Sequence, residues 1–199
     1  GSGWQPVEET TISAGEKRRG CSGPFGDLFF EPLHIVKGTR GSAQENFLQN
    51  WMADCMPGYF RQTNGGVHRG IFHGESNYQV QVIDDEAVSD ELLRSANLIL
   101  WGTDQSNSVL AKLIGDLPLA FEPDGVVVGG RKFSGKNVGL AACFPHPLNA
   151  QRYVAVVGGI APESITNATH LNLQLLPDYL VWDGDQVLAS GNFDSSWGL

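Results

Sequence analysis

Apolar and polar positions divide the chain into segments that resemble strands and helices. Apolar runs at residues 32–39, 78–83 and 97–101 have the length and composition of strands. Each is followed by a segment with helical features, and a helix is expected at about 106–114 after the third run. Strands that alternate with helices predict a largely parallel sheet covered by helices.

The helix expected after the first run has the clearest sequence signal. Ser42 is placed as its N-cap, and Glu45 follows three residues later as in a capping box. Apolar residues then recur at helical spacing, which predicts one face packed on the sheet. These residues are Phe47, Leu48, Trp51, Met52 and Cys55.

The pattern changes after residue 119. Two apolar runs flank Gly129-Gly130, which is typical of a tight hairpin. The runs at 138–144 and 153–159 are separated by too few residues for a helical crossover between parallel neighbours. We therefore predict a three-layer α/β sandwich, Rossmann-like or flavodoxin-like, whose sheet is mixed but mainly parallel, with a further helix at 162–176.

The domain organisation follows from the same pattern. Gly1-Ser2-Gly3 resembles a cloning remnant, and residues 4–22 lack apolar periodicity. We expect residues 1–22 to be a tag and a linker or edge segment, and residues 23–199 to form a single α/β domain.

Composition excludes several classes of protein. A net charge of −9 and only 13 Lys and Arg residues argue against a nucleic-acid partner. The apolar runs are too short to span a membrane, so the chain is expected to be soluble. Three widely spaced cysteines form neither a disulfide framework nor a paired metal site, and Cys143 is expected to be a small buried apolar residue.

Motifs for catalysis and cofactor binding are incomplete. Residues 130–137 match a phosphate-binding loop up to Lys136, but Asn137 stands where Ser or Thr should reach a magnesium ion. No Gly-x-Gly-x-x-Gly follows a strand, and no Gly-x-Ser-x-Gly nucleophile elbow is present. We therefore assign no catalytic residue, cofactor or metal site.

Two sets of residues are candidates for metal binding or acid–base chemistry. One contains two histidines, and the other is a run of acidic residues. His68 and His73 could bind a metal together with Glu75, although a solvated loop is the favoured interpretation. The run Asp84-Asp85-Glu86 could support acid–base chemistry, but we interpret it as a solvated strand exit.

Polar residues at three strand ends form the candidate ligand site. Parallel strands place their carboxyl ends together, so the turns at 38–40, 102–107 and 145–149 would converge if the strand at 139–144 runs with the others. Such a site would suit a carboxylate or a sugar hydroxyl. The alternative is structural: Asp104 or Ser106 caps a helix, and the last turn is only shaped by its polar residues. The candidate residues are Arg40, Asp104, Asn107, His146 and Asn149.

Several segments in order resemble the region that follows the catalytic domain in bacterial prolyl-oligopeptidase-like or esterase-like α/β-hydrolases. They include "GPFGDLFFEPLHIVKGT", "SANLILWGTDQSNSVLAKLIGDLP", "GVVVGGRKF", "FPHPLNAQRYVAVVGG" and "LPDYLVWDG". The resemblance covers residues 23–199. It implies a module of a secreted or periplasmic serine hydrolase that acts on peptides or polysaccharide esters, and it assigns no catalytic residue to this region.

Three functions therefore remain open. The first is a non-catalytic accessory or interaction domain whose partner is the hydrolase domain of the same parent chain. The second is a small-ligand or carbohydrate-binding module that uses the strand-end residues. The third is a stand-alone hydrolase with His146 as base and Asp104 as its orienting group, for which no nucleophile is evident.

Overall fold

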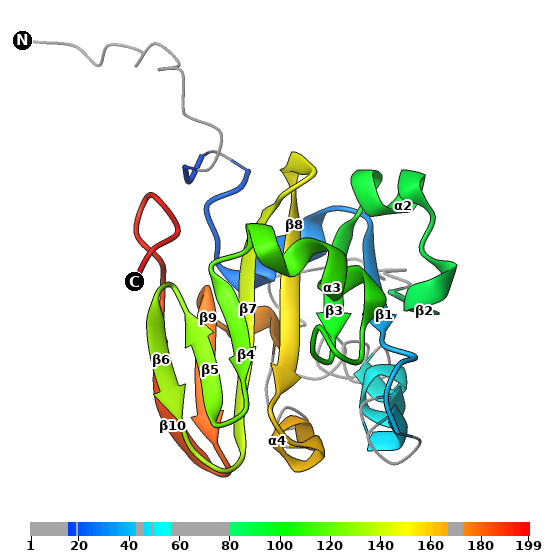
Figure 1. Cartoon of the computed structure of the whole chain (residues 1–199). Helices are drawn as coiled ribbons and strands as arrows, with labels where there is room; N and C mark the ends of the chain where they lie inside the picture. The colour runs from blue at the N-terminus through cyan, green and yellow to red at the C-terminus, as the bar shows by residue number, and fades with distance from the viewer. Residues whose placement is uncertain (1–15, 19, 43–45, 49, 57–79, 167–172) are drawn as a thin grey trace, which may run out of the picture.

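A computed structural model of the chain describes residues 16–18, 20–42, 46–48, 50–56, 80–166 and 173–199. Its centre is a seven-stranded sheet with the strand order β10-β9-β7-β8-β3-β1-β2 (Figure 1). The strands are β1 (Leu33–Lys37), β2 (Gln81–Asp84), β3 (Asn97–Trp101), β7 (Val138–His146), β8 (Asn149–Gly159), β9 (Tyr179–Asp183) and β10 (Gln186–Gly191).

One half of the sheet is parallel. β1 pairs in parallel with β2 on one side and with β3 on the other, and β3 pairs in parallel with β8. Ile35 lies opposite Ile99, and all five residues of β3 are buried. A strand buried on both faces needs a continuous apolar run, which is what residues 98–101 supply. The predicted parallel pairing of the first three strands is confirmed.

The other half is antiparallel. β7 runs against β8, β9 against β7, and β10 against β9. The predicted mixed α/β sheet is confirmed, but the expectation that it would be mainly parallel is wrong, because three of its six pairings are antiparallel. The reason is the short turn after His146, which returns the chain as a hairpin.

A second, three-stranded antiparallel sheet packs on this half. It consists of β4 (Leu119–Glu122), β5 (Gly125–Val128) and β6 (Arg131–Ser134). Gly129 and Gly130 have φ of 56° and 82°, the backbone that a two-residue hairpin turn requires, so the predicted hairpin is confirmed. β5 contacts β7, and Figure 1 shows the small sheet lying over the antiparallel strands.

Short helices connect the strands. The predicted helix at 162–176 is found only as α4 and η5, with residues 167–172 outside the described part of the chain. Three α-helices follow β1 and the helix after it in the described part of the chain: α2 (Asp90–Ser95), α3 (Ser108–Leu113) and α4 (Pro162–Thr166). The 3₁₀ turns are η1 (Phe25–Phe30), η2 (Asp85–Ala87), η3 (Ile114–Asp116) and η5 (Leu173–Leu175).

The helix after β1, helical at 46–48 and 50–56, turns a different face to the sheet from the one predicted. Phe47 and Trp51 are 67% and 54% exposed, and Cys55 is also exposed. Met52, Ala53 and Met56 are buried instead. The predicted stripe mixed two faces: positions 47, 51 and 55 lie above one another on the solvent side, whereas Met52 and the half-buried Leu48 one turn before it lie on the face toward the core.

The start of the described chain packs against its end. The backbone amide of Lys17 donates to the carbonyl of Ser195 at 2.8 Å, and its ammonium group pairs with Asp178 and lies 4.9 Å from the ring centroid of Trp197. Cys21 is 2% exposed. Residues 17, 18 and 21, which were predicted to belong to a linker or edge segment ending at residue 22, therefore pack against the rest of the described chain.

Candidate functional site

Asp85 is the centre of a hydrogen-bonded cluster at the carboxyl ends of β1, β2 and β3. It follows β2 directly and is 3% exposed. One carboxylate oxygen accepts from the backbone amide of Thr39 at 3.1 Å and from the Thr39 hydroxyl at 2.8 Å. The other accepts from the backbone amide of Ser108 at 2.5 Å, at the start of α3. The sequence interpretation of Asp85 as part of a solvated strand exit is therefore wrong for this residue.

The pKa of Asp85 reflects these contacts. Burial alone would raise it, but the hydrogen bonds from Ser108 and Thr39 outweigh burial and lower it. Asp85 is therefore an ionised carboxylate whose charge is stabilised by donors of the protein itself. Through these hydrogen bonds, the Asp85 carboxylate connects the ends of β1 and β2 with the start of α3.

Asn107 closes the neighbouring turn. Its side-chain oxygen accepts from the backbone amides of Val109 and Leu110, which makes it the N-cap of α3. Its amide nitrogen donates to the carbonyls of Val36 and Trp101. The capping role expected for Asp104 or Ser106 belongs to Asn107, and this residue has no hydrogen-bonding atom left for a ligand.

The turns after β1 and β3 lie directly against each other. The backbone amide of Arg40 donates to the carbonyl of Ser106 at 2.9 Å. A Cβ on Gly38 would lie 2.2 Å from that same carbonyl oxygen, so only glycine fits. Arg40 is exposed and Asp104 half-buried beside this contact. Arg40, Asp104 and Asn107 therefore lie at the same end of the sheet, next to the carboxyl ends of β1 and β3. The buried polar groups at this end form hydrogen bonds with one another.

His146 and Asn149 lie at the opposite end. β7 runs antiparallel to β8, and β8 runs parallel to β3, so the end of β7 lies beside the start of β3. The side-chain amide of Asn149 accordingly donates to the carbonyl of Arg94 at 2.6 Å, at the end of α2. The predicted convergence of the five candidate residues is wrong, because the hairpin reverses the strand on which His146 lies.

His146 itself is buried in this amino-end face. Its Nδ1 accepts from the backbone amide of Leu148 at 3.1 Å, and its Nε2 is buried without a hydrogen-bond partner among the described residues. Burial lowers the pKa of the imidazole. His146 is therefore a neutral side chain that hydrogen-bonds within its own turn and shapes the hairpin. This agrees with the alternative interpretation of the sequence, in which the polar residues of this turn have a structural role.

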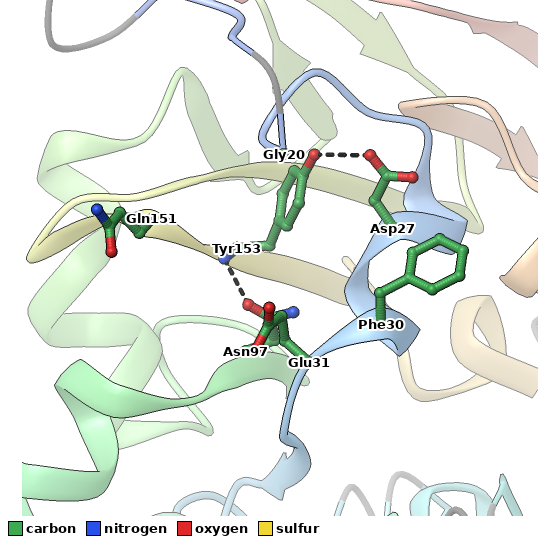
Figure 2. A pocket seen from close by; sticks show the side chains of 7 residues that line it. All are labelled: Gly20, Asp27, Phe30, Glu31, Asn97, Gln151 and Tyr153. Atoms are coloured by element: carbon green, nitrogen blue, oxygen red, sulfur yellow. Dashed lines mark hydrogen bonds between the residues drawn. The ribbon is translucent and has the colours of Figure 1, made fainter. Parts of the chain in front are cut away.

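A hollow of about 280 Å³ opens at the amino-end face, and we call it the amino-end pocket (Figure 2). The hydroxyl of Tyr153 donates to Asp27 at 3.0 Å and accepts from the backbone amide of Gly23 at 2.9 Å. Sequence reasoning missed this pocket because its residues come from η1 and β8, which no single motif connects. Its lining residues are Gly20, Asp27, Phe30, Glu31, Asn97, Gln151 and Tyr153.

Asn97 is the structural support of the pocket. Its side-chain oxygen accepts from the backbone amide of Tyr153 at 2.8 Å, and its amide nitrogen donates to the carbonyl of Leu28 at 2.9 Å. Both side-chain groups of this buried residue are thereby used in joining β3, β8 and η1. The amide consequently fixes the position of Tyr153 and of the turn that carries Asp27.

Burial sets the protonation of the two central groups. It raises the pKa of Asp27, against the hydrogen bond from Tyr153, and the charge of Asp178 raises it further. Burial also raises the pKa of the Tyr153 hydroxyl, which therefore stays protonated and donates. Tyr153 is thus the donor and Asp27 the acceptor of a hydrogen bond that is partly shielded from solvent.

Two of the three cysteines, Cys21 and Cys143, are poor nucleophiles in this structure. Burial raises the pKa of the Cys21 thiol, and it raises that of the completely buried Cys143 well above the usual range. A thiol needs a lowered pKa and access to react. The prediction that Cys143 is a buried apolar residue is confirmed.

Metal ligands do not assemble within the described part of the chain, where no group of three or more His, Cys, Asp or Glu side chains could hold an ion. The His68, His73 and Glu75 combination lies outside the described residues. The phosphate-loop-like segment at 130–137 contains strand β6 and leads into β7, so it does not open a helix.

No protein-family model fits this chain, and no curated protein is significantly similar to it. None of the helices formed by the described residues is both long and apolar enough to cross a membrane.

Proposed function

We propose that this chain is a non-catalytic interaction domain of a bacterial serine hydrolase of the peptidase or esterase type, and that it docks on the hydrolase domain of its parent protein. The observation that carries the proposal is a pair of exposed apolar side chains on two touching turns. Phe30 on η1 is 73% exposed, and Leu175 on η5 is 68% exposed.

The two turns form one surface, which we call the η1–η5 face. A Cβ on Gly26 would lie 2.6 Å from the carbonyl oxygen of Gln174, so the turns are in direct contact. Phe25, Leu28 and Leu173 point inward and are fully buried. Because the turns already anchor themselves with these residues, Phe30 and Leu175 are not needed for the core, and large exposed apolar groups mark interaction surfaces.

The chemistry of the described residues supports a non-catalytic role. The carboxyl ends of β1 and β3, where open α/β sheets usually bind ligands, are occupied by the bonds of Asp85 and Asn107. The candidate base His146 lies at the other end of the sheet from Asp104. The substrate, a peptide or polysaccharide ester, would then belong to the hydrolase domain.

Two further proposals accompany this one. The helices and the small sheet would make the domain a three-layer sandwich, Rossmann-like or flavodoxin-like in its parallel half. The parent protein would be secreted or periplasmic, as the resemblance to bacterial hydrolases implies. The described residues form an α/β fold with short connections. This fold is compatible with a three-layer sandwich and with a secreted or periplasmic parent protein.

Binding and activity measurements test the function together. Isothermal titration of this chain into the separately produced hydrolase domain should give a one-to-one complex, and the chain alone should not hydrolyse p-nitrophenyl acetate. Phe30→Ser and Leu175→Ser should each weaken the complex by about tenfold or more, as expected for central apolar contacts.

Val187→Ser is the matched control, since Val187 is also exposed, at 57%, but lies on the edge strand β10. It should leave the affinity unchanged. Ester hydrolysis that persists through repurification, or a complex that tolerates both Phe30→Ser and Leu175→Ser, would refute the proposal.

A further inference from the structure

The charged residues among the described lining of the amino-end pocket are both acidic. They are Asp27 and Glu31, and Glu31 is already paired with Arg152. The guanidinium of Arg152 lies 3.5 Å from Glu31 and also donates to the carbonyl of Ser95. Asp27 is therefore the carboxylate of the pocket that makes no ion pair with a cation in the described part of the chain, and its charge attracts cations.

Asp27 has one oxygen available for a ligand. Its Oδ2 accepts from the Tyr153 hydroxyl, while its Oδ1 makes no hydrogen bond with any residue in the described part of the chain. Tyr153 is held in turn by the amide of Gly23 and by Asn97. The carboxylate is thus oriented by a rigid support and is still able to accept from outside.

Keeping this carboxylate partly buried opposes its ionisation, as the raised pKa of Asp27 shows. A neutral side chain in the same place would avoid that cost. Groups that are unfavourable for the isolated fold are frequent at binding sites, where the ligand supplies the missing interaction. A positive charge is the interaction that Asp27 lacks.

Phe30 adds the second element of a cation site. Its exposed ring belongs to the same turn as Asp27 and lines the pocket, and Figure 2 shows both side chains on η1. An aromatic face beside carboxylates attracts organic cations. A volume of about 280 Å³ is far larger than a metal ion needs and suits an alkylammonium group.

We propose that the amino-end pocket receives a lysine side chain of the docking partner, whose ammonium group pairs with Asp27 and Glu31 and whose methylenes lie on Phe30. The inference rests on the proposed function, because Phe30 belongs both to the η1–η5 face and to the pocket. The partner surface would then present a lysine flanked by apolar residues.

Small probes test the pocket without the partner. In ¹H–¹⁵N NMR titrations of this chain, n-butylammonium should shift the amide signals of Gly20, Phe30 and Tyr153 saturably, whereas n-butanol should not. Binding of the cation should also lower the pKa of Asp27, followed by ¹³C NMR of its carboxyl carbon. Equal effects of the ammonium ion and the alcohol would overturn the inference.

Charge-neutral variants connect the pocket with the partner. Asp27→Asn retains an oxygen that can accept from Tyr153 and should therefore fold, yet it should weaken n-butylammonium binding and the complex with the hydrolase domain by about fivefold. Glu31→Gln should act in the same direction. Glu163→Gln, an exposed position in the first turn of α4, is the control and should have no effect.

The outcomes separate the two proposals. If Phe30→Ser weakens the complex while Asp27→Asn and Glu31→Gln do not, the docking face stands and the lysine pocket is refuted. If n-butylammonium binds in an Asp27-dependent manner but the hydrolase domain does not bind, the pocket is a site for free amines, and both the lysine assignment and the proposed function are refuted.

Discussion

The carboxylate of Asp85 accepts a hydrogen bond of 2.5 Å from the backbone amide of Ser108, and this bond joins the end of β2 to the start of α3. The same side chain also accepts two hydrogen bonds from Thr39 after β1. A single buried charge thus fixes three connections at the carboxyl ends of the parallel strands. Its loss should affect the whole parallel half of the sheet.

Asp85→Asn should destabilise the protein by about 2–4 kcal/mol, because an amide cannot accept all three hydrogen bonds and places an unpaired donor in a buried position. Urea denaturation followed by circular dichroism measures the change. Asp84→Asn is the neighbouring control, an exposed carboxylate 3.7 Å from Lys37, and should cost less than about 1 kcal/mol. Equal costs for the two variants would contradict the central role of Asp85.

Asn107→Ala should cost about 2–4 kcal/mol, because it removes the cap of α3 and leaves the carbonyls of Val36 and Trp101 without this donor. Asp104→Ala should cost less than about 0.5 kcal/mol, since the Asp104 carboxylate accepts a hydrogen bond from the side chain of exposed Gln105. Thermal unfolding distinguishes the two. A larger loss for Asp104→Ala would restore Asp104 as the helix cap.

Gly38→Ala should destabilise the fold by roughly 1–3 kcal/mol, because the added methyl group would meet the backbone carbonyl of Ser106 and force the two turns apart. Gly115→Ala tests the specificity of that effect, since a Cβ there meets no atom within 4 Å. It should be neutral or stabilising by up to about 1 kcal/mol. The midpoint of urea unfolding gives both values, and a neutral Gly38→Ala would show that the turns are not in close contact.

His146 should make the protein sensitive to mild acid. Burial lowers the pKa of this imidazole below its usual value of about 6.5, so the unfolded chain binds the proton more readily than the folded one. The stability associated with neutral His146 is therefore complete above pH ~6.5 and is lost as the pH falls through the folded pKa.

The variant His146→Gln keeps an acceptor for the amide of Leu148 and cannot titrate. Unfolding free energies measured from pH 7.5 down to pH 5 should fall less steeply for this variant than for the wild type. His34→Gln, at a half-buried histidine on β1, is the matched His-to-Gln control. Parallel pH profiles for wild type and His146→Gln would show that His146 is not the acid-sensitive group.

Local patterns predicted much of the fold. The apolar run 98–101 indicated a buried strand, and Gly129-Gly130 indicated a hairpin, because burial on both faces and a tight turn each leave a signature in adjacent residues. The helix after β1 shows the limit of this approach. Phe47 and Met52 are both apolar, but only the packed structure decides which face of a helix meets the sheet.

The site depended on information that is not local. His146 ends a strand whose direction is set by its pairing with β8, and the sequence near His146 does not specify that pairing. Asp85 stands between two acidic residues, and its burial depends on the packing of α3 against η2, which the local sequence does not show. Asp27 and Tyr153 are 126 positions apart, so their hydrogen bond could not be inferred from either segment alone.

The contact between Lys17 and Ser195 has a consequence for synthesis of the protein on the ribosome. Asp178 is 1% exposed, and one of its carboxylate oxygens, Oδ2, accepts hydrogen bonds from Lys17 and from the backbone amide of Phe193. Lys17 is synthesised before Asp178, which lies 161 positions later in the chain, so the segment around Lys17 can pack only after its partners have emerged. Until they have emerged, this segment is accessible to chaperones and proteases.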